Sequence, residues 1–74
     1  MELNEATGIT GALKQANVEK AKVEVHLTSG KSFAGLVQAI GDHHVVMTEL
    51  SGKEFFGAVV RLGDIAAVET RLRK

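Results

Sequence analysis

Two adjacent histidines, His43 and His44, follow Asp42 in a short polar segment near the middle of the sequence. Imidazoles contact nucleic acids, bind metal ions, and also occur as ordinary polar side chains of turns. Because successive side chains of a strand point to opposite faces, the two imidazoles do not readily hold one ion within a single chain. A shared ion would need histidines from several subunits. An RNA contact, a metal ligand between subunits and a polar turn all remain open at this point.

A second polar group surrounds Arg61, which is followed by Leu62, Gly63 and Asp64. An arginine guanidinium can contact a phosphate or a base edge, and it can instead form an ion pair with Asp42 or Asp64. These two aspartates are the only ones in the chain, and each directly follows a glycine. Polar side chains that could contact a ligand are thus found in two short segments, 42–44 and 61–64.

Catalytic chemistry is not indicated by the sequence. No Ser/His/Asp arrangement or paired carboxylates stand out, and the Ser-Gly-Lys triplets at 29–31 and 51–53 lack the spacing of a phosphate-binding P-loop. The absence of cysteine excludes disulfides and thiolate metal sites, and no His/Asp/Glu cluster has convincing metal-ligand spacing. We therefore expect no enzyme, no cofactor and no metal site.

Charge and size restrict the partners of this 74-residue chain. Residues 1–70 carry six basic and nine acidic side chains, a net charge of −3, and the tail 71–74 adds three basic residues. Such an acidic body binds phosphates poorly, so any nucleic-acid site must be local or must repeat around several subunits. A core of this size provides only about 3–5 kcal/mol of net stability, yet 45% of the residues are hydrophobic. Self-association is the expected use of this apolar excess.

The N-terminal sequence does not resemble a secretory signal, since it has neither a basic segment nor a following apolar segment. No apolar run approaches the roughly 20 residues that cross a bilayer. We expect a cytoplasmic protein without a membrane partner.

The hydrophobic pattern changes from a helical period to a strand period near residue 22. Residues 4–16 are expected to form a helix, in which the apolar stripe is Ile9, Ala12, Leu13 and Ala16. Asn4 or Thr10 could cap its start, and Asn17 suits the left-handed position after its end. Alternating apolar residues and glycine-containing turns then predict strands over 22–27, 32–40, 44–49, 54–62 and 65–70. These elements predict a single mainly β domain over 1–74, a small barrel preceded by a helix.

The sequence repeats itself at an offset of 22 residues. Ser-Gly-Lys-x-Phe-x-Gly-x-Val occurs at 29–37 and again at 51–59, and Gly-Asp follows at 41–42 and 63–64. Turn formation alone explains the turn glycines, but not the lysine, phenylalanine and valine in the same phase, so we interpret the pattern as two duplicated hairpins. Gly35 and Gly57 then fall in mid-strand, where glycine is typical of a sharp bend or a close backbone approach.

Two segments resemble the motifs of the Sm-like (Sm/LSm/Hfq) family. Residues 23–47 are similar to the first Sm motif, with Gly30, Phe33, Gly35 and Gly41-Asp42 in the matching order, and residues 59–69 are similar to the second. The resemblance implies an N-terminal helix followed by a five-stranded, strongly bent antiparallel Sm-like (SH3-like) barrel. The sequence departs from the family where Leu62 follows Arg61 in place of a glycine and where the Tyr-Lys-His signature of Hfq is missing.

The resemblance also implies how the protein assembles and what it binds. Sm-like proteins form rings of six or seven subunits, in which the fourth strand of one subunit pairs with the fifth strand of the next. Their RNA contacts lie in the turns after the second and fourth strands, which face the pore. The resemblance therefore implies six candidate RNA-binding positions in this chain, which are Asp42, His43, His44, Arg61, Gly63 and Asp64. A homo-oligomeric ring of five to seven subunits that binds single-stranded RNA is the implied function, and a protein-interaction or structural ring without nucleic acid is the alternative.

Two further groups of side chains are expected to lie away from the pore. Lys31 and Lys53 occupy equivalent repeat positions at hairpin tips, where solvated lysines are common. Phe55 and Phe56 are expected in the core and the subunit interface rather than in a base-stacking site.

Overall fold

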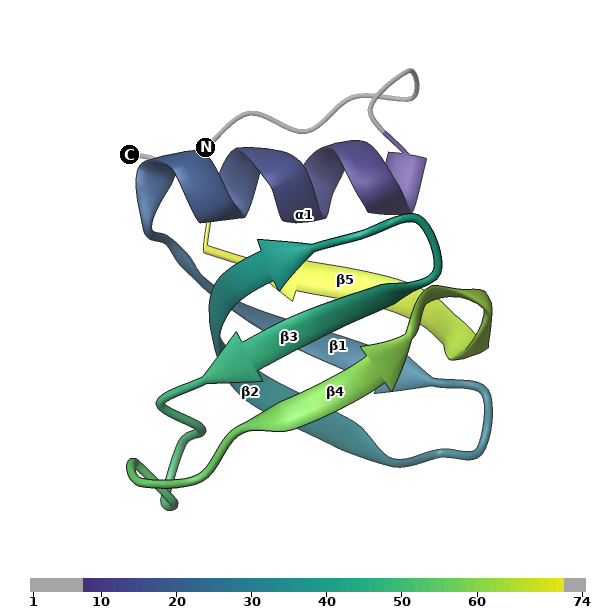
Figure 1. The fold of residues 1–74 in the computed structure, drawn as a ribbon. Helices are drawn as coiled ribbons and strands as arrows, with labels where there is room; N and C mark the ends of the chain where they lie inside the picture. The colour runs from purple at the N-terminus through teal and green to yellow at the C-terminus, as the bar shows by residue number, and fades with distance from the viewer. Residues whose placement is uncertain (1–7, 72–74) are drawn as a thin grey trace.

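The computed structural model describes residues 8–71 as one helix followed by five strands (Figure 1). The elements, in chain order, are α1 (Gly8–Glu19), β1 (Lys22–Leu27), β2 (Ser32–Ile40), β3 (His44–Thr48), β4 (Ala58–Arg61), the 3-10 turn η1 (Leu62–Asp64) and β5 (Ile65–Thr70). The bounds of β1, β2 and β5 agree with the predicted strands. Among these residues no helix is long and apolar enough to span a membrane.

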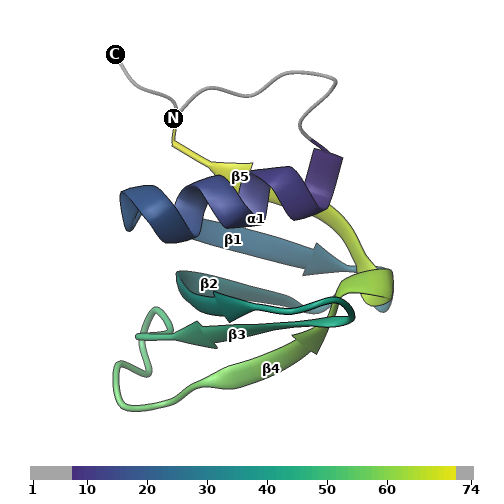
Figure 2. The same cartoon turned by 45° about the horizontal axis from the view of Figure 1, so that its top comes forward.

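The helix α1 buries Ala12, Leu13 and Ala16 and packs on β2 and β5 (Figures 1 and 2). It therefore uses the predicted apolar stripe. Its end lies beyond the predicted position, because Lys20 adopts the left-handed conformation (φ 55°) and the Ala21 amide donates to the Ala16 carbonyl at 3.0 Å. This bond satisfies a carbonyl of the last helical turn.

Neither cap proposed within the described residues is correct. Thr10 and Asn17 both lie inside α1, and the expected start at residue 4, with Asn4 as its cap, falls outside the described residues. The helix continues past Asn17 to Glu19. In this last turn the Gln15 side chain donates to the Glu19 carboxylate at 3.0 Å.

The five strands form one antiparallel sheet in the order β4-β3-β2-β1-β5. Each of the hairpins β1–β2, β2–β3 and β3–β4 joins neighbours in the sheet, and β5 pairs with β1. Register shifts within β2 and at the end of β1 mark irregularities at which the sheet curves. The curved sheet and α1 enclose a single core of buried residues: Ala12, Leu13, Ala16, Val23, Val25, Val37, Val45, Met47, Leu50, Val60 and Ile65.

The fourth strand begins at Ala58, whereas the sequence predicted a strand over 54–62, and the third strand ends at Thr48 rather than at residue 49. Glu49 has a positive φ of 51° and so leaves the strand conformation. Two successive turns follow, in which Lys53 N–H donates to Leu50 O at 2.8 Å and Phe56 N–H donates to Lys53 O at 2.9 Å. These amides bond within the loop and are not available to a strand ladder.

The repeated Ser-Gly-Lys segments share a left-handed glycine, but their turn hydrogen bonds are offset by one position, from Gly30 N–H to Leu27 O in the first and from Lys53 N–H to Leu50 O in the second. Gly30 and Gly52 both have left-handed φ values, 97° and 79°. In β2, Gly35 lies against the β3 backbone, and a Cβ atom there would lie 2.6 Å from the Thr48 carbonyl oxygen. Gly57 precedes β4 rather than lying in mid-strand, and its Cβ would lie 3.1 Å from the Met47 carbonyl oxygen. The two repeat glycines thus both lie against the backbone of β3, and Gly35 lies closer to it than Gly57 does.

Candidate functional site

The two turns predicted to carry the site meet at one end of the sheet. The Leu62 N–H donates to the His43 carbonyl at 2.8 Å, and His44 is the cross-strand partner of Arg61. The Gly41 N–H donates to the His44 carbonyl, also at 2.8 Å, which closes the β2–β3 turn. Two segments whose bonded residues are 17 to 19 positions apart in the sequence therefore form one backbone-bonded surface. The β3–β4 pairing positions it, and β4 leads directly into η1.

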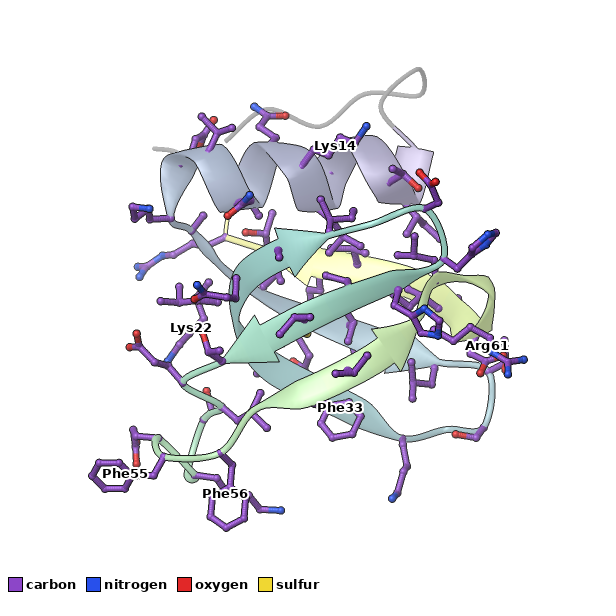
Figure 3. All side chains as sticks on the ribbon, in the orientation of Figure 1. Lys14, Lys22, Phe33, Phe55, Phe56 and Arg61 are labelled. Atoms are coloured by element: carbon purple, nitrogen blue, oxygen red, sulfur yellow. The ribbon has the colours of Figure 1, made fainter. Side chains whose placement is uncertain are left out.

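All six predicted site positions are exposed on this surface, which we call the turn surface: Asp42, His43, His44, Arg61, Gly63 and Asp64. Within residues 8–71, Arg61 makes no ion pair with Asp42 or with Asp64. The guanidinium is therefore available to an external anion in this conformation. Figure 3 shows Arg61 at the end of the sheet opposite to Phe55 and Phe56.

The repeat lysines Lys31 and Lys53 line the same hollow, but their local contacts differ. Lys31 follows the β1–β2 turn, in which the Thr28 N–H donates to the Asp64 carbonyl at 2.8 Å. The backbone of this hairpin is thus bonded to the turn surface. Lys53 lies in the β3–β4 loop, where its Nζ atom is 5.9 Å from the centroid of the Phe56 ring.

Phe55 and Phe56 are not core residues in the single chain. Their exposed fractions are 101% and 62%, because the segment that was predicted as a strand is a loop and directs neither ring into the sheet. Val59 in β4 and Val18 in α1 are also exposed, by 68% and 80%. The subunit-interface part of the prediction is compatible with these exposed side chains.

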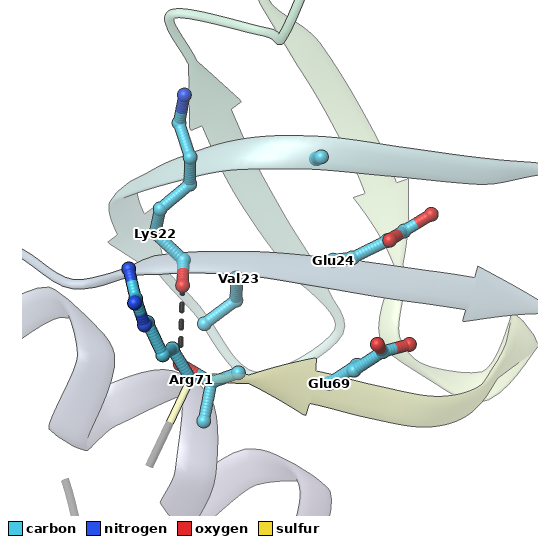
Figure 4. Close-up of a pocket in the computed structure, with 7 residues that line it drawn as sticks. Lys22, Val23, Glu24, Glu69 and Arg71 are labelled. Atoms are coloured by element: carbon cyan, nitrogen blue, oxygen red, sulfur yellow. Dashed lines mark hydrogen bonds between the residues drawn. The ribbon is translucent and has the colours of Figure 1, made fainter. Parts of the chain in front are cut away.

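A second polar group, which the sequence interpretation missed, lies on β1 and β5. Glu24 and Glu69 are direct cross-strand partners, and His26 Nε2 lies 2.9 Å from Glu69 Oε1. Glu24 and Glu69 also line a shallow hollow beside Lys22 and Arg71 (Figure 4). The alternating pattern of β1 already placed Glu24 and His26 on one face, but their proximity to Glu69 depends on the β1–β5 register, which the sequence does not reveal.

Comparison with known proteins identifies the fold. No protein-family model matches the sequence, and no curated protein shows significant similarity to it. Among solved structures, a 1.55 Å crystal structure of the pleiotropic translational regulator Hfq is similar, with a TM-score of 0.73 and 13% sequence identity. The match covers 95% of this chain and 100% of the Hfq chain. The helix, the five antiparallel strands and this match over nearly the whole chain show that the protein has the Sm-like fold.

Proposed function

We propose that the protein forms a homo-oligomeric ring of five to seven subunits that binds single-stranded RNA at the turn surface. The observation that carries this proposal is the convergence of the β2–β3 turn and η1, which exposes two imidazoles and a guanidinium without an ion pair to Asp42 or Asp64. In Sm-like proteins the corresponding turns face the pore and contact RNA. The structural similarity to the translational regulator Hfq also supports the proposed RNA binding.

The open ends of the sheet support assembly. β4 and β5 are the two outer strands, so within residues 8–71 each has one edge without a neighbouring strand. An unpaired edge is a template for another chain, and Val59 adds an exposed apolar side chain to β4. Pairing β4 of one subunit with β5 of the next would satisfy both edges and repeat around a closed ring.

Replacing Val59 with lysine is expected to disrupt the ring and leave the fold intact. The side chain is already 68% exposed, so a charge there costs the single chain little, whereas a charged residue on an edge strand opposes pairing with another strand. Light scattering at micromolar concentration would measure the mass. Val18→Lys is the matched control, because Val18 is also an exposed valine but lies on α1. A parent that is a stable monomer, or a Val59→Lys variant of unchanged mass, would contradict the assembly.

RNA binding has to overcome the acidic charge of the body. A ring would bring one copy of Arg61, His43 and His44 per subunit around a common axis, and this repetition concentrates donors that are sparse in one chain. Filter binding with labelled U-rich and A-rich oligonucleotides at low salt tests the proposal directly. Saturable binding of either RNA is expected, and absence of binding to both at pH 6 would overturn the RNA part of the proposal.

A protein-interaction or structural ring without nucleic acid is the second candidate. The observation in its favour is the β3–β4 loop, where Phe55 and Phe56 are exposed far from Arg61 (Figure 3). Exposed aromatic side chains are enriched where proteins bind one another. A ring-sized mass together with no RNA binding by the parent would favour this candidate.

A further inference from the structure

We propose that Glu24, His26 and Glu69 form a binding site for a divalent transition-metal ion of the Zn²⁺ type on the outer face of β1 and β5. One donor atom from each residue lies within 4.8 Å of the other two. Glu24 and His26 are alternate residues of β1 and share a face, and Glu69 projects from the neighbouring strand to the same side.

The arrangement of the two carboxylates is the reason to expect a cation. Glu24 and Glu69 are directly opposite each other in the β1–β5 ladder, and like charges in that position destabilise a sheet. Within residues 8–71, neither carboxylate forms an ion pair with a lysine or an arginine. Figure 4 shows Glu24 and Glu69 extending side by side, away from Lys22 and Arg71. The nearby basic side chains do not neutralise the repulsion between the two carboxylates. A cation bound between them would do so.

The histidine ligand favours Zn²⁺ over cations that bind only oxygen ligands. His26 Nε2 lies 2.9 Å from Glu69 Oε1, so the histidine already points at the carboxylate. One imidazole and two carboxylates suit Zn²⁺, whereas Mg²⁺ and Ca²⁺ prefer oxygen ligands alone. Donors around tetrahedral Zn²⁺ lie about 3.3–3.6 Å apart. The present donor separations, 2.9 Å for His26 and Glu69 and at most 4.8 Å for the other pairs, lie on either side of that spacing, and water would complete the coordination.

The location makes the site independent of RNA binding and distinct from the turn surface. His26 and Glu69 remain 41% and 70% exposed, which leaves room for an ion and its water ligands. An ion held by both strands would tie the outer strand β5 to β1. It would therefore stabilise the strand whose free edge is proposed to receive the next subunit, although binding itself does not require the ring.

Isothermal titration of the full chain with zinc chloride tests the site in the presence of excess Mg²⁺. One Zn²⁺ per chain is expected, together with a melting temperature that rises with zinc concentration, because a ligand of the folded state stabilises it. Loss of an outer-shell partner already weakens metal binding by about 10–100-fold, so His26→Gln should weaken it by at least about tenfold. Glu24→Gln should do the same while melting, without zinc, no lower than the parent, since it removes a like-charge contact.

The matched control is the double variant His43→Gln/His44→Gln, which removes the other two histidines of the chain. It should bind Zn²⁺ as the parent does. No zinc binding by the parent would overturn the proposal. Retention of binding in both His26→Gln and Glu24→Gln would also overturn it. So would a loss of binding in the double variant alone, since the ion would then belong to the turn surface.

Discussion

Replacing Gly35 with valine is expected to lower the free energy of unfolding by about 3 kcal/mol or more, the upper range for overpacked sites. A Cβ at this position would lie 2.6 Å from the Thr48 carbonyl oxygen and 3.2 Å from that of Glu49. Both obstacles are backbone atoms, one at the end of β3 and one in the residue that follows it, and they cannot rotate away as a side chain can. The loss is comparable with the whole net stability of a domain this small, about 3–5 kcal/mol.

Gly57→Val provides the matched control, because Gly57 holds the same position in the sequence repeat. Its Cβ would meet the Met47 carbonyl oxygen at 3.1 Å, and the residue is exposed in the loop before β4. A shift of a few tenths of an ångström relieves that contact, so a loss of about 1 kcal/mol, near the lower end for such sites, is expected. Urea denaturation followed by circular dichroism would measure both variants. Equal losses, or a Gly35→Val protein as stable as its parent, would contradict a bend that depends on Gly35.

Strands with regular alternation were predictable from the sequence, because each of their two faces meets a different environment. β1 buries Val23 and Val25 and directs Glu24 and His26 to the other face, which is the pattern that a half-buried strand requires. The bounds of β1, β2 and β5 follow from this pattern and from the turns beside them. The end of α1 did not follow from the sequence, since Lys20 rather than an asparagine takes the left-handed conformation.

The fourth strand shows how an internal repeat can mislead. The match between the two Phe-x-Gly-x-Val segments suggested two equivalent strands, but Phe33 lies in β2 whereas Phe55 lies in a loop. The turns after Leu50 engage the loop amides and leave a shorter β4. Local similarity accounts for the left-handed conformation that Gly30 and Gly52 share, whereas the length of the strand depended on pairing with β3.

The candidate site was located through the family resemblance rather than through composition. Nothing in the local sequence indicates that the Leu62 amide bonds the His43 carbonyl, because that contact joins two different turns. The cluster of Glu24, His26 and Glu69 was missed for a related reason: three donors from distant segments share no sequence spacing. Proximity across strands requires the sheet register, which only the fold provides.

Arg61→Ala is expected to weaken RNA binding by at least about tenfold. A hydrogen bond to a charged group contributes about 1.5–3 kcal/mol, and 1.4 kcal/mol corresponds to a tenfold change in affinity. Arg61 is exposed and makes no ion pair with either aspartate of the turn surface. Its truncation should therefore leave the fold and the mass of the ring unchanged, which circular dichroism and light scattering would verify before the titration of a labelled oligonucleotide.

The double variant His43→Ala/His44→Ala should also weaken binding, and Lys53→Ala should leave it unchanged. Lys53 is the sharper lysine control, because the hairpin before Lys31 is bonded to Asp64 of the turn surface. The dependence on salt should be shallow, because few phosphates are neutralised. Loss of affinity in Lys53→Ala with full binding by Arg61→Ala would move the RNA site from the turn surface to the β3–β4 loop.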